Sequence, residues 1–368
     1  MPRTGDEMRR RHLLKGSLAL GLSTAFAPVA LHAQQGEPFY RGKTINILVG
    51  LEAGGTVDLF ARMFSQVMQK HIPGNPTLVV QNMPGAGGLL ATNFLAEKAK
   101  ADGLTILWGP WDPLAQALAL PSMRARYEKF EFLGGTGDTR VLYANANSIP
   151  GGLKTPADIA KGDMLTVGAL NATDPSGLLA HLALGVLGVK DKMVIGYRGG
   201  NDVFLAMQRN EVQFHSTSIT TFRGRNAEFI KSGQGMGIAY LVPADASGNF
   251  QPNSFITEMP AFPQLYREIN GKPPAGPLWD ATNWLVSQIG EMAFVGLAPA
   301  GTPPEAVAAL RAGYAAAAND PDFVRQSVSM NGLPYSFVPV DRGTAIFGSL
   351  ATVTPEVLAT LNQIIDKK

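Results

Sequence analysis

Residues 44–68 read TINILVGLEAGGTVDLFARMFSQVM, and this stretch decides the fold. Its first part, Thr44–Gly50, is a short apolar run of the β type. After a Gly-Gly turn, apolar side chains recur with the spacing of one helix face, at Val57, Phe60, Ala61, Phe64, Val67 and Met68. Gly55 or Thr56 suits the helix N-cap, and Asp58 lies in the first turn. The stretch therefore predicts a strand, a tight glycine turn and a helix.

The same unit of strand, turn and helix recurs further along the chain. Expected strands lie at 78–81, 104–108, 164–170 and 194–197. Expected helices lie at 89–100, 178–187, 202–208, 303–318, 320–328 and 355–365. Because strands alternate with helices, the pattern predicts an α/β fold with two doubly wound, mostly parallel sheets and helices on both faces.

Two extended runs, 141–144 and 236–242, fall outside this alternation. Each is suited to carry the chain between sheets, the first outward and the second back. At 368 residues the chain also exceeds one typical core. We therefore predict two lobes, 34–141 plus 240–368 and 142–239, with a cleft between them. Residues 243–292 are rich in proline and aromatic residues, and their weak periodicity predicts no element.

The N-terminus has the pattern of an export signal. Arg9–Arg11 precede an apolar run at 18–31, which ends in the small-residue cleavage pattern Leu31-His32-Ala33. Residues 10–15 also match the twin-arginine type of signal. The run is shorter than the ~20 residues of a membrane span, so we expect a signal peptide at 1–33, cleavage near Ala33 and a periplasmic location. Removing 1–33 takes away five basic and two acidic residues, which changes the net charge from +2 to −1.

Composition and motifs argue against several functional classes. Without cysteine the chain has no disulfide, thiolate metal site or cysteine nucleophile. The five histidines show no metal-ligand spacing, and neither a phosphate loop nor a nucleophile elbow occurs. The mature net charge gives no electrostatic footprint for nucleic acid. We therefore expect no catalytic residue, no metal, no cofactor and no nucleic-acid partner.

Glycine-rich turns that lead into helix N-termini are the candidate site. A helix start presents unpaired backbone N–H groups and a partial positive charge, which suit an anion. Glycine lets a ligand approach the backbone closely, and such turns lie at the ligand-binding edge of α/β sheets. If each lobe aims one turn into the cleft, backbone amides hold a small carboxylate without any Arg or Lys. The implicated residues are Gly54, Gly55, Thr56 and Asp58 in the first turn and Asn171, Thr173 and Ser176 in a later one.

Several of these residues also have a plainer interpretation. Gly54 and Gly55 suit a purely structural turn. Asp58 suits a first-turn residue that complements its own helix, because a carboxylate repels an anionic ligand. Arg198 suits either a ligand carboxylate or a solvated loop position. His215 is expected to be a packed histidine.

Five segments carry a further signal in their order along the chain: Ala53–Asp58, Asn82–Gly88, Ala101–Thr105, Tyr197–Gly200 and Leu297–Pro303. Together they resemble the substrate-binding family of tripartite tricarboxylate transporters, the Bug/TctC-like receptors. The resemblance implies a two-lobed periplasmic-binding-protein fold of type II and a small organic acid as ligand. It implies delivery of that ligand to a large and a small membrane subunit, by a receptor expected to be a monomer.

The resemblance also bears on single residues. It implies that the first turn, including Ala53, and the loop 171–176 hold the ligand carboxylate, and it adds Arg198 and Gly199 to the candidate ligand-binding residues. Leu51-Glu52 stands where the family usually has two prolines, so Glu52 adds a negative charge at the cleft mouth. Two other functions stay open on the sequence alone. They are the same clamp feeding a signalling receptor, and a periplasmic enzyme for which Asp58 with His215 is the acid–base pair to nominate.

Overall fold

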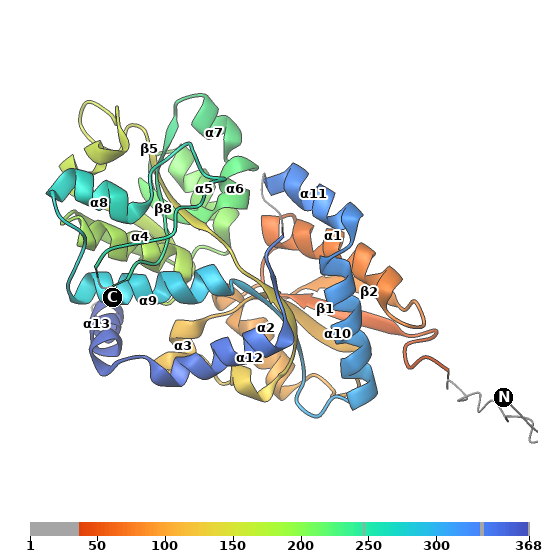
Figure 1. The fold of residues 1–368 in the computed structure, drawn as a ribbon. Helices are drawn as coiled ribbons and strands as arrows, with labels where there is room; N and C mark the ends of the chain where they lie inside the picture. The colour runs from red at the N-terminus through yellow and green to blue at the C-terminus, as the bar shows by residue number, and fades with distance from the viewer. Residues whose placement is uncertain (1–36, 246, 332–334, 367–368) are drawn as a thin grey trace, which may run out of the picture. The chain divides into compact units, whose positions relative to one another are not determined.

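The computed structural model describes residues 37–245, 247–331 and 335–366. The predicted signal peptide, 1–33, lies outside them. Two β-sheets, each covered by helices, make up the described chain (Figure 1). The predicted α/β fold with two sheets is confirmed, whereas the exact limits of the two lobes stay a prediction. One expectation is wrong: the sheets are mixed rather than mostly parallel.

The first sheet takes its strands from both ends of the described chain. They are β1 (Thr44–Val49), β2 (Thr77–Asn82), β3 (Thr105–Pro110), β4 (Glu131–Thr136), β10 (Phe294–Ala298) and β11 (Phe337–Val338). Their order across the sheet is β11-β4-β10-β3-β1-β2. β1 is parallel to β2 and β3, whereas β10 is antiparallel to β3 and β4. The stretch 44–68 thus lies within the parallel part of this sheet.

The second sheet repeats the arrangement with the middle of the chain. Its strands are β5 (Arg140–Asn145), β6 (Met164–Ala169), β7 (Lys190–Ile195), β8 (Phe214–Ser218) and β9 (Gly235–Tyr240). Their order is β7-β6-β8-β5-β9, with β6 parallel to β7 and β8, and with β5 antiparallel to β8 and β9. β4 ends at Thr136 and β5 begins at Arg140, so residues 137–139 carry the chain from the first sheet to the second, and residues 241–293 carry it back from β9 to β10.

Helices cover both faces of the first sheet because alternate residues of a strand face opposite sides. Ile45, Ile47 and Val49 of β1 pack with α1 and α10, whereas Leu48 packs in a separate core with α2 and α12. The helices on this side of the molecule are α1 (Thr56–His71), α2 (Leu89–Glu97), α3 (Pro113–Ala117), α10 (Pro304–Ala318), α11 (Pro321–Asn331) and α12 (Val340–Ser349).

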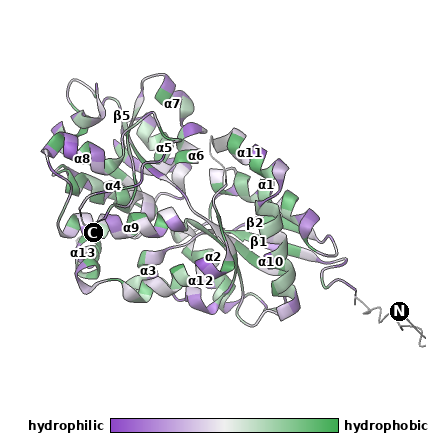
Figure 2. Ribbon diagram, viewed as in Figure 1, coloured by the Kyte–Doolittle hydropathy of each residue, from purple (hydrophilic) through white to green (hydrophobic). Residues whose placement is uncertain are grey.

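The second sheet is covered in the same way. Leu142 and Ala144 of β5 pack with α4 and α9, whereas Val141 and Tyr143 pack with α5, α6 and α7. Its helices are α4 (Pro175–Val186), α5 (Gly200–Gln208), α6 (Ile219–Arg223), α7 (Ala227–Lys231), α8 (Phe262–Asn270), α9 (Pro277–Glu291) and α13 (Pro355–Asp366). Figure 2 shows α4 as mostly hydrophobic, which fits its place between the sheet and α9. Four short 3-10 helices are η1 (Ala86–Gly88), η2 (Tyr127–Lys129), η3 (Pro156–Lys161) and η4 (Leu350–Thr352).

Some elements differ from the sequence-based expectations. β7 begins at Lys190, four residues before the expected strand, and ends at Ile195. Its early start was missed because its first three residues are all charged and show no apolar pattern. The helix expected at 89–100 ends at Glu97. β4, β8 and β10 were not predicted. β8 reads FHSTS, which is hydrophilic by composition yet largely buried. The unassigned segment 243–292 contains α8 and α9.

Among the described residues, no single helix is both long and apolar enough for a membrane span. The segments Val340–Thr352 and Pro355–Ile365 reach that measure only when taken together, and the chain bends by 82° between them.

Candidate functional site

A cavity of about 290 Å³ lies between the two sheets. The first lobe lines it with the loop between β1 and α1, with Trp108 of β3 and with the connection 136–139. The second lobe lines it with the starts of α4 and α5, with β8 and with the loop after α6. The volume is near the lower end of the range for small-molecule sites, about 300–1,000 Å³. The cavity therefore suits a small ligand held by both lobes.

The start of α1 is open toward this cavity. Gly54 has a φ of +76°, which favours glycine, and Gly55 is an N-cap without a side-chain hydrogen bond. In the described part of the chain, no acceptor bonds the N–H groups of Thr56, Val57 and Asp58. Gly55, Thr56 and Val57 line the cavity. This helix start thus has the unpaired donors and the positive partial charge that the sequence-based hypothesis requires.

Asp58 has a structural role, which was the plainer of its two interpretations. Its carboxylate accepts hydrogen bonds from the Gly54 N–H (2.9 Å), the Arg62 Nε (3.0 Å) and the Asn82 Nδ2 (2.9 Å). Burial alone would raise the pKa of Asp58, but these bonds outweigh it and hold the pKa below its ordinary value. Asp58 does not line the cavity. The nominated acid–base pair of Asp58 and His215 therefore shares no site.

The later turn is engaged by the protein itself, which corrects the expectation of open amides there. Asp174 caps α4, and its carboxylate accepts from the N–H groups of Ser176 and Gly177. Thr173 is buried outside the cavity lining, and its hydroxyl donates at 2.6 Å to Asp112, which does line the cavity. The side chains of Asn171 and Ser176 do line the cavity. The cap was missed because the sequence analysis began this helix at residue 178, after Asp174.

Four further predicted residues, Ala53, Gly54, Arg198 and Gly199, lie outside the cavity lining. Arg198 is 84% exposed and pairs with Asp202 in the first turn of α5, a geometry that fits its solvated interpretation. Ala53 is exposed on the first turn. Gly199 is the N-cap of α5, where no side chain caps the helix. The next two residues, Gly200 and Asn201, do line the cavity, and their N–H groups have no acceptor among the described residues.

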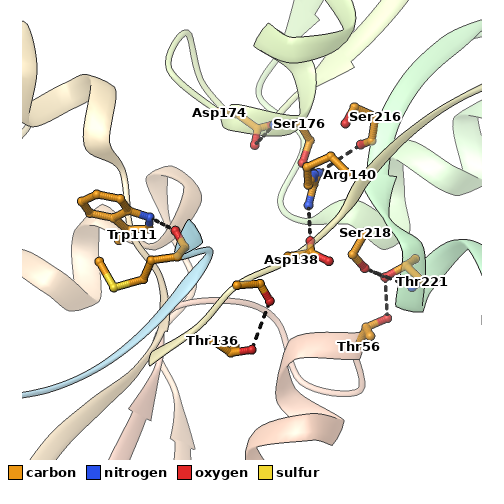
Figure 3. A network of polar contacts seen from close by, with 12 residues as sticks. Thr56, Trp111, Thr136, Asp138, Arg140, Asp174, Ser176, Ser216, Ser218 and Thr221 are labelled. Atoms are coloured by element: carbon orange, nitrogen blue, oxygen red, sulfur yellow. Dashed lines mark hydrogen bonds and ion pairs between the residues drawn. The ribbon is translucent and has the colours of Figure 1, made fainter. Parts of the chain in front are cut away.

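An arginine that the sequence analysis missed lies in the cavity wall. Arg140 is the first residue of β5, and its side chain is only 12% exposed. Its guanidinium donates to Asp138 (Nη1 to Oδ2, 3.3 Å), to the Ser176 hydroxyl and to the Ser216 carbonyl (3.3 Å), as Figure 3 shows. Its Nε has no acceptor in the described chain. In the sequence, only its position just before the run 141–144, which was expected to carry the chain between sheets, sets Arg140 apart from a surface residue.

Neighbouring polar groups of the second lobe also have unused hydrogen-bonding capacity. Asn226 is 1% exposed and His215 4% exposed, and both line the cavity. Neither the Asn226 amide atoms nor the His215 Nδ1 has a hydrogen-bond partner within the described residues. Burial and the nearby Arg140 charge lower the pKa of His215 to about 3, so its ring is neutral. Arg140, His215 and Asn226 thus bring one cation together with neutral donors and acceptors.

Four hydrogen bonds join the lobes beside the cavity in the described chain. Thr221 bonds Thr56 between hydroxyls (3.3 Å), as Figure 3 shows. Asn171 donates to the Ala86 carbonyl (2.8 Å), and Arg225 donates to the Gly54 carbonyl (3.0 Å). The Thr173–Asp112 bond is the fourth. The lobes therefore meet around the cavity through polar contacts, which are easier to exchange with water than an apolar core.

The contact between Thr173 and Asp112 involves a carboxyl group, so its contribution to stability depends on pH. Burial raises the pKa of Asp112 to about 6, although the hydrogen bonds from Thr173 and Ala115 oppose the rise. Because the pKa of Asp112 in the folded protein lies above its ordinary value, protonated Asp112 contributes to the free energy of unfolding. This contribution is complete below pH ~4 and is lost as pH rises through about 6. Asp112→Asn is expected to raise the free energy of unfolding at pH 8 by about 1–2 kcal/mol, with no gain at pH 4. Thermal or urea unfolding at both pH values measures it.

A matched variant checks this assignment. Asp163 is exposed, so Asp163→Asn is expected to change stability little at either pH. An equal gain from Asp112→Asn at both pH values would contradict the assignment, because only an ionisable carboxyl produces a pH-dependent difference.

No protein-family model matches the chain, but part of its sequence is similar to known proteins. Protein BugT of Bordetella pertussis is 36% identical over 102 residues, which cover 27% of this chain and 30% of BugT. The aligned part is thus less than a third of that relative's length.

No metal-binding group of three or more His, Cys, Asp or Glu side chains occurs within the described ranges.

Solved structures resemble the chain over most of its length. The periplasmic binding protein BugD superposes with a TM-score of 0.62 at 19% identity, covering 89% of this chain and 97% of BugD. Rpa4515 of R. palustris, solved with adipate, has a TM-score of 0.66 at 18% identity and covers 87% and 98%. At such identities the likeness shows the fold, which is that of periplasmic binding proteins. The predicted two-lobed fold class is confirmed.

Proposed function

We propose that this chain is a receptor of the Bug/TctC-like type, to whose members it is similar, and that it captures a small organic carboxylate outside the cytoplasm. It then delivers the ligand to the large and small membrane subunits of a tripartite tricarboxylate-type transporter. The proposal includes export by the N-terminal signal, action as a monomer in the periplasm, and binding without catalysis.

The observation that carries the proposal is the position of Arg140. Its guanidinium and the uncapped start of α1 line the same cavity, and they come from different lobes. A carboxylate between them gains charge-assisted hydrogen bonds from one side and a helix N-terminus on the other. A ligand that contacts both lobes also stabilises their closed arrangement. The amide-only site expected from the sequence is therefore replaced by one that includes a cation.

The available interactions are strong enough for a transport receptor. Each charge-assisted hydrogen bond contributes about 1.5–3 kcal/mol, and a partly buried helix start contributes up to ~2 kcal/mol. Four or five such bonds together with the helix start, less the cost of ordering the ligand, give roughly −8 kcal/mol, which corresponds to about micromolar affinity.

Ligand-induced stabilisation tests the proposal. At about a hundredfold excess over its Kd, the correct carboxylate is expected to raise Tm by roughly 5 °C, because only the folded clamp binds it. The protein is unfolded, dialysed and refolded first to remove carried-over ligand, and a broad panel of small organic acids is screened by differential scanning fluorimetry. The amide of each acid serves as the uncharged control. No shift with any acid, or equal shifts with the amides, would overturn the proposal.

A further inference from the structure

Glu52 lies between the two uncapped helix starts of the cavity. It belongs to the loop between β1 and α1, and its carbonyl accepts the N–H of Gly55, the N-cap of α1. A Cβ built on Gly55 would lie 3.7 Å from the Glu52 Oε1. On the other lobe, a Cβ built on Gly199, the N-cap of α5, would lie 1.7 Å from Oε2 and 1.8 Å from Oε1. The carboxylate therefore reaches across the cavity to the opposite lobe.

The Glu52 carboxylate lies against the backbone of Gly199. Gly199 has φ of −171°, an extended conformation that any residue adopts. Its backbone therefore does not require glycine, but a side chain at this position would displace the Glu52 carboxylate from its place. Sequence analysis placed Gly199 among ligand-binding residues, and the structure places the protein's own carboxylate against it.

The Glu52 carboxylate lies at the start of α5, where the second lobe would otherwise bind an anion. The N–H groups of Gly200 and Asn201 open α5 without an acceptor within the described ranges, and a helix start favours negative charge. The Glu52 Oε2 is buried and makes no hydrogen bond to any described residue. A ligand carboxylate at this point would meet a negative charge that is already in place.

The overall charge of the cavity lining also disfavours a ligand carboxylate at this point. Four carboxyl groups, those of Glu52, Asp112, Asp138 and Asp174, line the cavity against the two guanidinium groups of Arg140 and Arg225. Asp112 and Asp174 are engaged by hydrogen bonds within the protein, and Arg225 donates to the Gly54 carbonyl and to Asn201. Both acceptors of Arg225 are neutral, whereas Arg140 is paired with Asp138. The four carboxyl groups still outnumber the two guanidinium groups of the described lining, so the lining disfavours a second ligand carboxylate.

We infer that Glu52 is a specificity-determining residue, which limits the cavity to ligands with one carboxylate, bound at Arg140, and excludes dicarboxylates. The inference rests on the proposed function and narrows its ligand class. The remainder of the ligand is uncharged and meets the neutral His215 and Asn226. Glu52 acts by occupying the anion position between α1 and α5, and the charge of its side chain repels a second carboxylate.

Matched pairs of acids test the inference on the mature protein after removal of carried-over ligand. Each pair has the same carbon number and differs by one carboxylate, from propionate and malonate up to octanoate and suberate, and it includes hexanoate and adipate. Isothermal titration calorimetry with wild type, Glu52→Gln and Glu228→Gln gives the ratio of affinities within each pair. Glu228 is 91% exposed on α7 and outside the cavity lining, so its variant controls for the loss of one negative charge.

The expected result has two parts. The wild type and Glu228→Gln bind the monocarboxylate of the best pair more tightly than its dicarboxylate. Glu52→Gln, which keeps the side-chain shape, tightens dicarboxylate binding by about tenfold or more and changes monocarboxylate binding little. Glu52→Ala shifts the ratio in the same direction.

Two different outcomes would overturn the inference, and they are distinguishable from each other. If the wild type prefers dicarboxylates, or Glu52→Gln leaves the ratio within a pair unchanged, Glu52 is not a specificity-determining residue, although the chain still binds carboxylates. If no acid of either kind binds to any variant, the proposed function itself fails, and the narrower inference fails with it.

Discussion

Replacing Arg140 is expected to weaken binding of the carboxylate ligand by about a hundredfold or more, because at least two charge-assisted hydrogen bonds of about 1.5–3 kcal/mol each are lost. The guanidinium is the cation that faces the unpartnered polar wall of the second lobe. Its removal also leaves Asp138 unpaired in the cavity wall, where a negative charge repels the ligand. Titration calorimetry of Arg140→Ala with the acid that gives the largest thermal shift measures the loss.

Folding needs a separate check, because removal of one partner from a buried ion pair is strongly destabilising. Burial raises the pKa of Asp138 to about 6 even beside Arg140. The double variant Arg140→Gln with Asp138→Asn removes both charges and leaves side chains that still form hydrogen bonds. It is expected to fold, with near wild-type circular dichroism and Tm, and to bind the acid as weakly as Arg140→Ala.

Arg198 supplies the matched control for this prediction. It is an arginine of the second lobe, but it is exposed and paired with Asp202. Arg198→Ala is therefore expected to leave affinity within about twofold, as is usual for exposed ion pairs. Equal losses for Arg198→Ala and Arg140→Ala would show a general effect of charge and would contradict a specific role for Arg140.

The contrast between these two arginines shows what the sequence supports. Arg198 was nominated because it follows a strand and stands in a family-like motif, and both are local features. Arg140 precedes an apolar run, and nothing local distinguishes it from a surface residue at a strand start. Its burial arises because residues 137–139 pass between the sheets, which brings Arg140 against Ser176 and Ser216 from distant parts of the chain.

The fold was predictable where hydrophobic periodicity is strong. The first strand and helix were predicted close to their observed limits, Thr44–Val49 and Thr56–His71. Strand β8 was missed because its side chains that line the cavity are polar, so it lacks the hydrophobic pattern of a core strand. The open start of α1 was predictable from its glycines, but the engagement of α4 by Asp174 was not, since it depends on the orientation of one side chain.

The start of α4 depends on close contact between a helix and a strand. Gly177 lies in the first turn of α4 and is buried against β6. A Cβ at this position would lie 2.3 Å from the Ala169 Cβ, 2.9 Å from the Gly168 carbonyl oxygen and 3.0 Å from the Ala169 Cα. β6 is paired with strands on both sides, so these atoms have little freedom to move. The next residue toward the cavity is Ser176, which contacts Arg140.

Gly177→Ala is therefore expected to lower the free energy of unfolding by about 2–3 kcal/mol, because overpacking against fixed backbone forces the helix away from its sheet. The displaced Ser176 would also weaken acid binding. Gly185→Ala is the control on the same helix: its Cβ would meet only the Leu278 Cδ1 at 3.5 Å, so it is expected to raise stability by about 0.5–1 kcal/mol. Urea unfolding measures both, and adding Ala169→Gly to Gly177→Ala should restore part of the loss. If Gly177→Ala matches the wild type, α4 does not lie as close to β6 as described, and the position of Ser176 beside Arg140 is wrong.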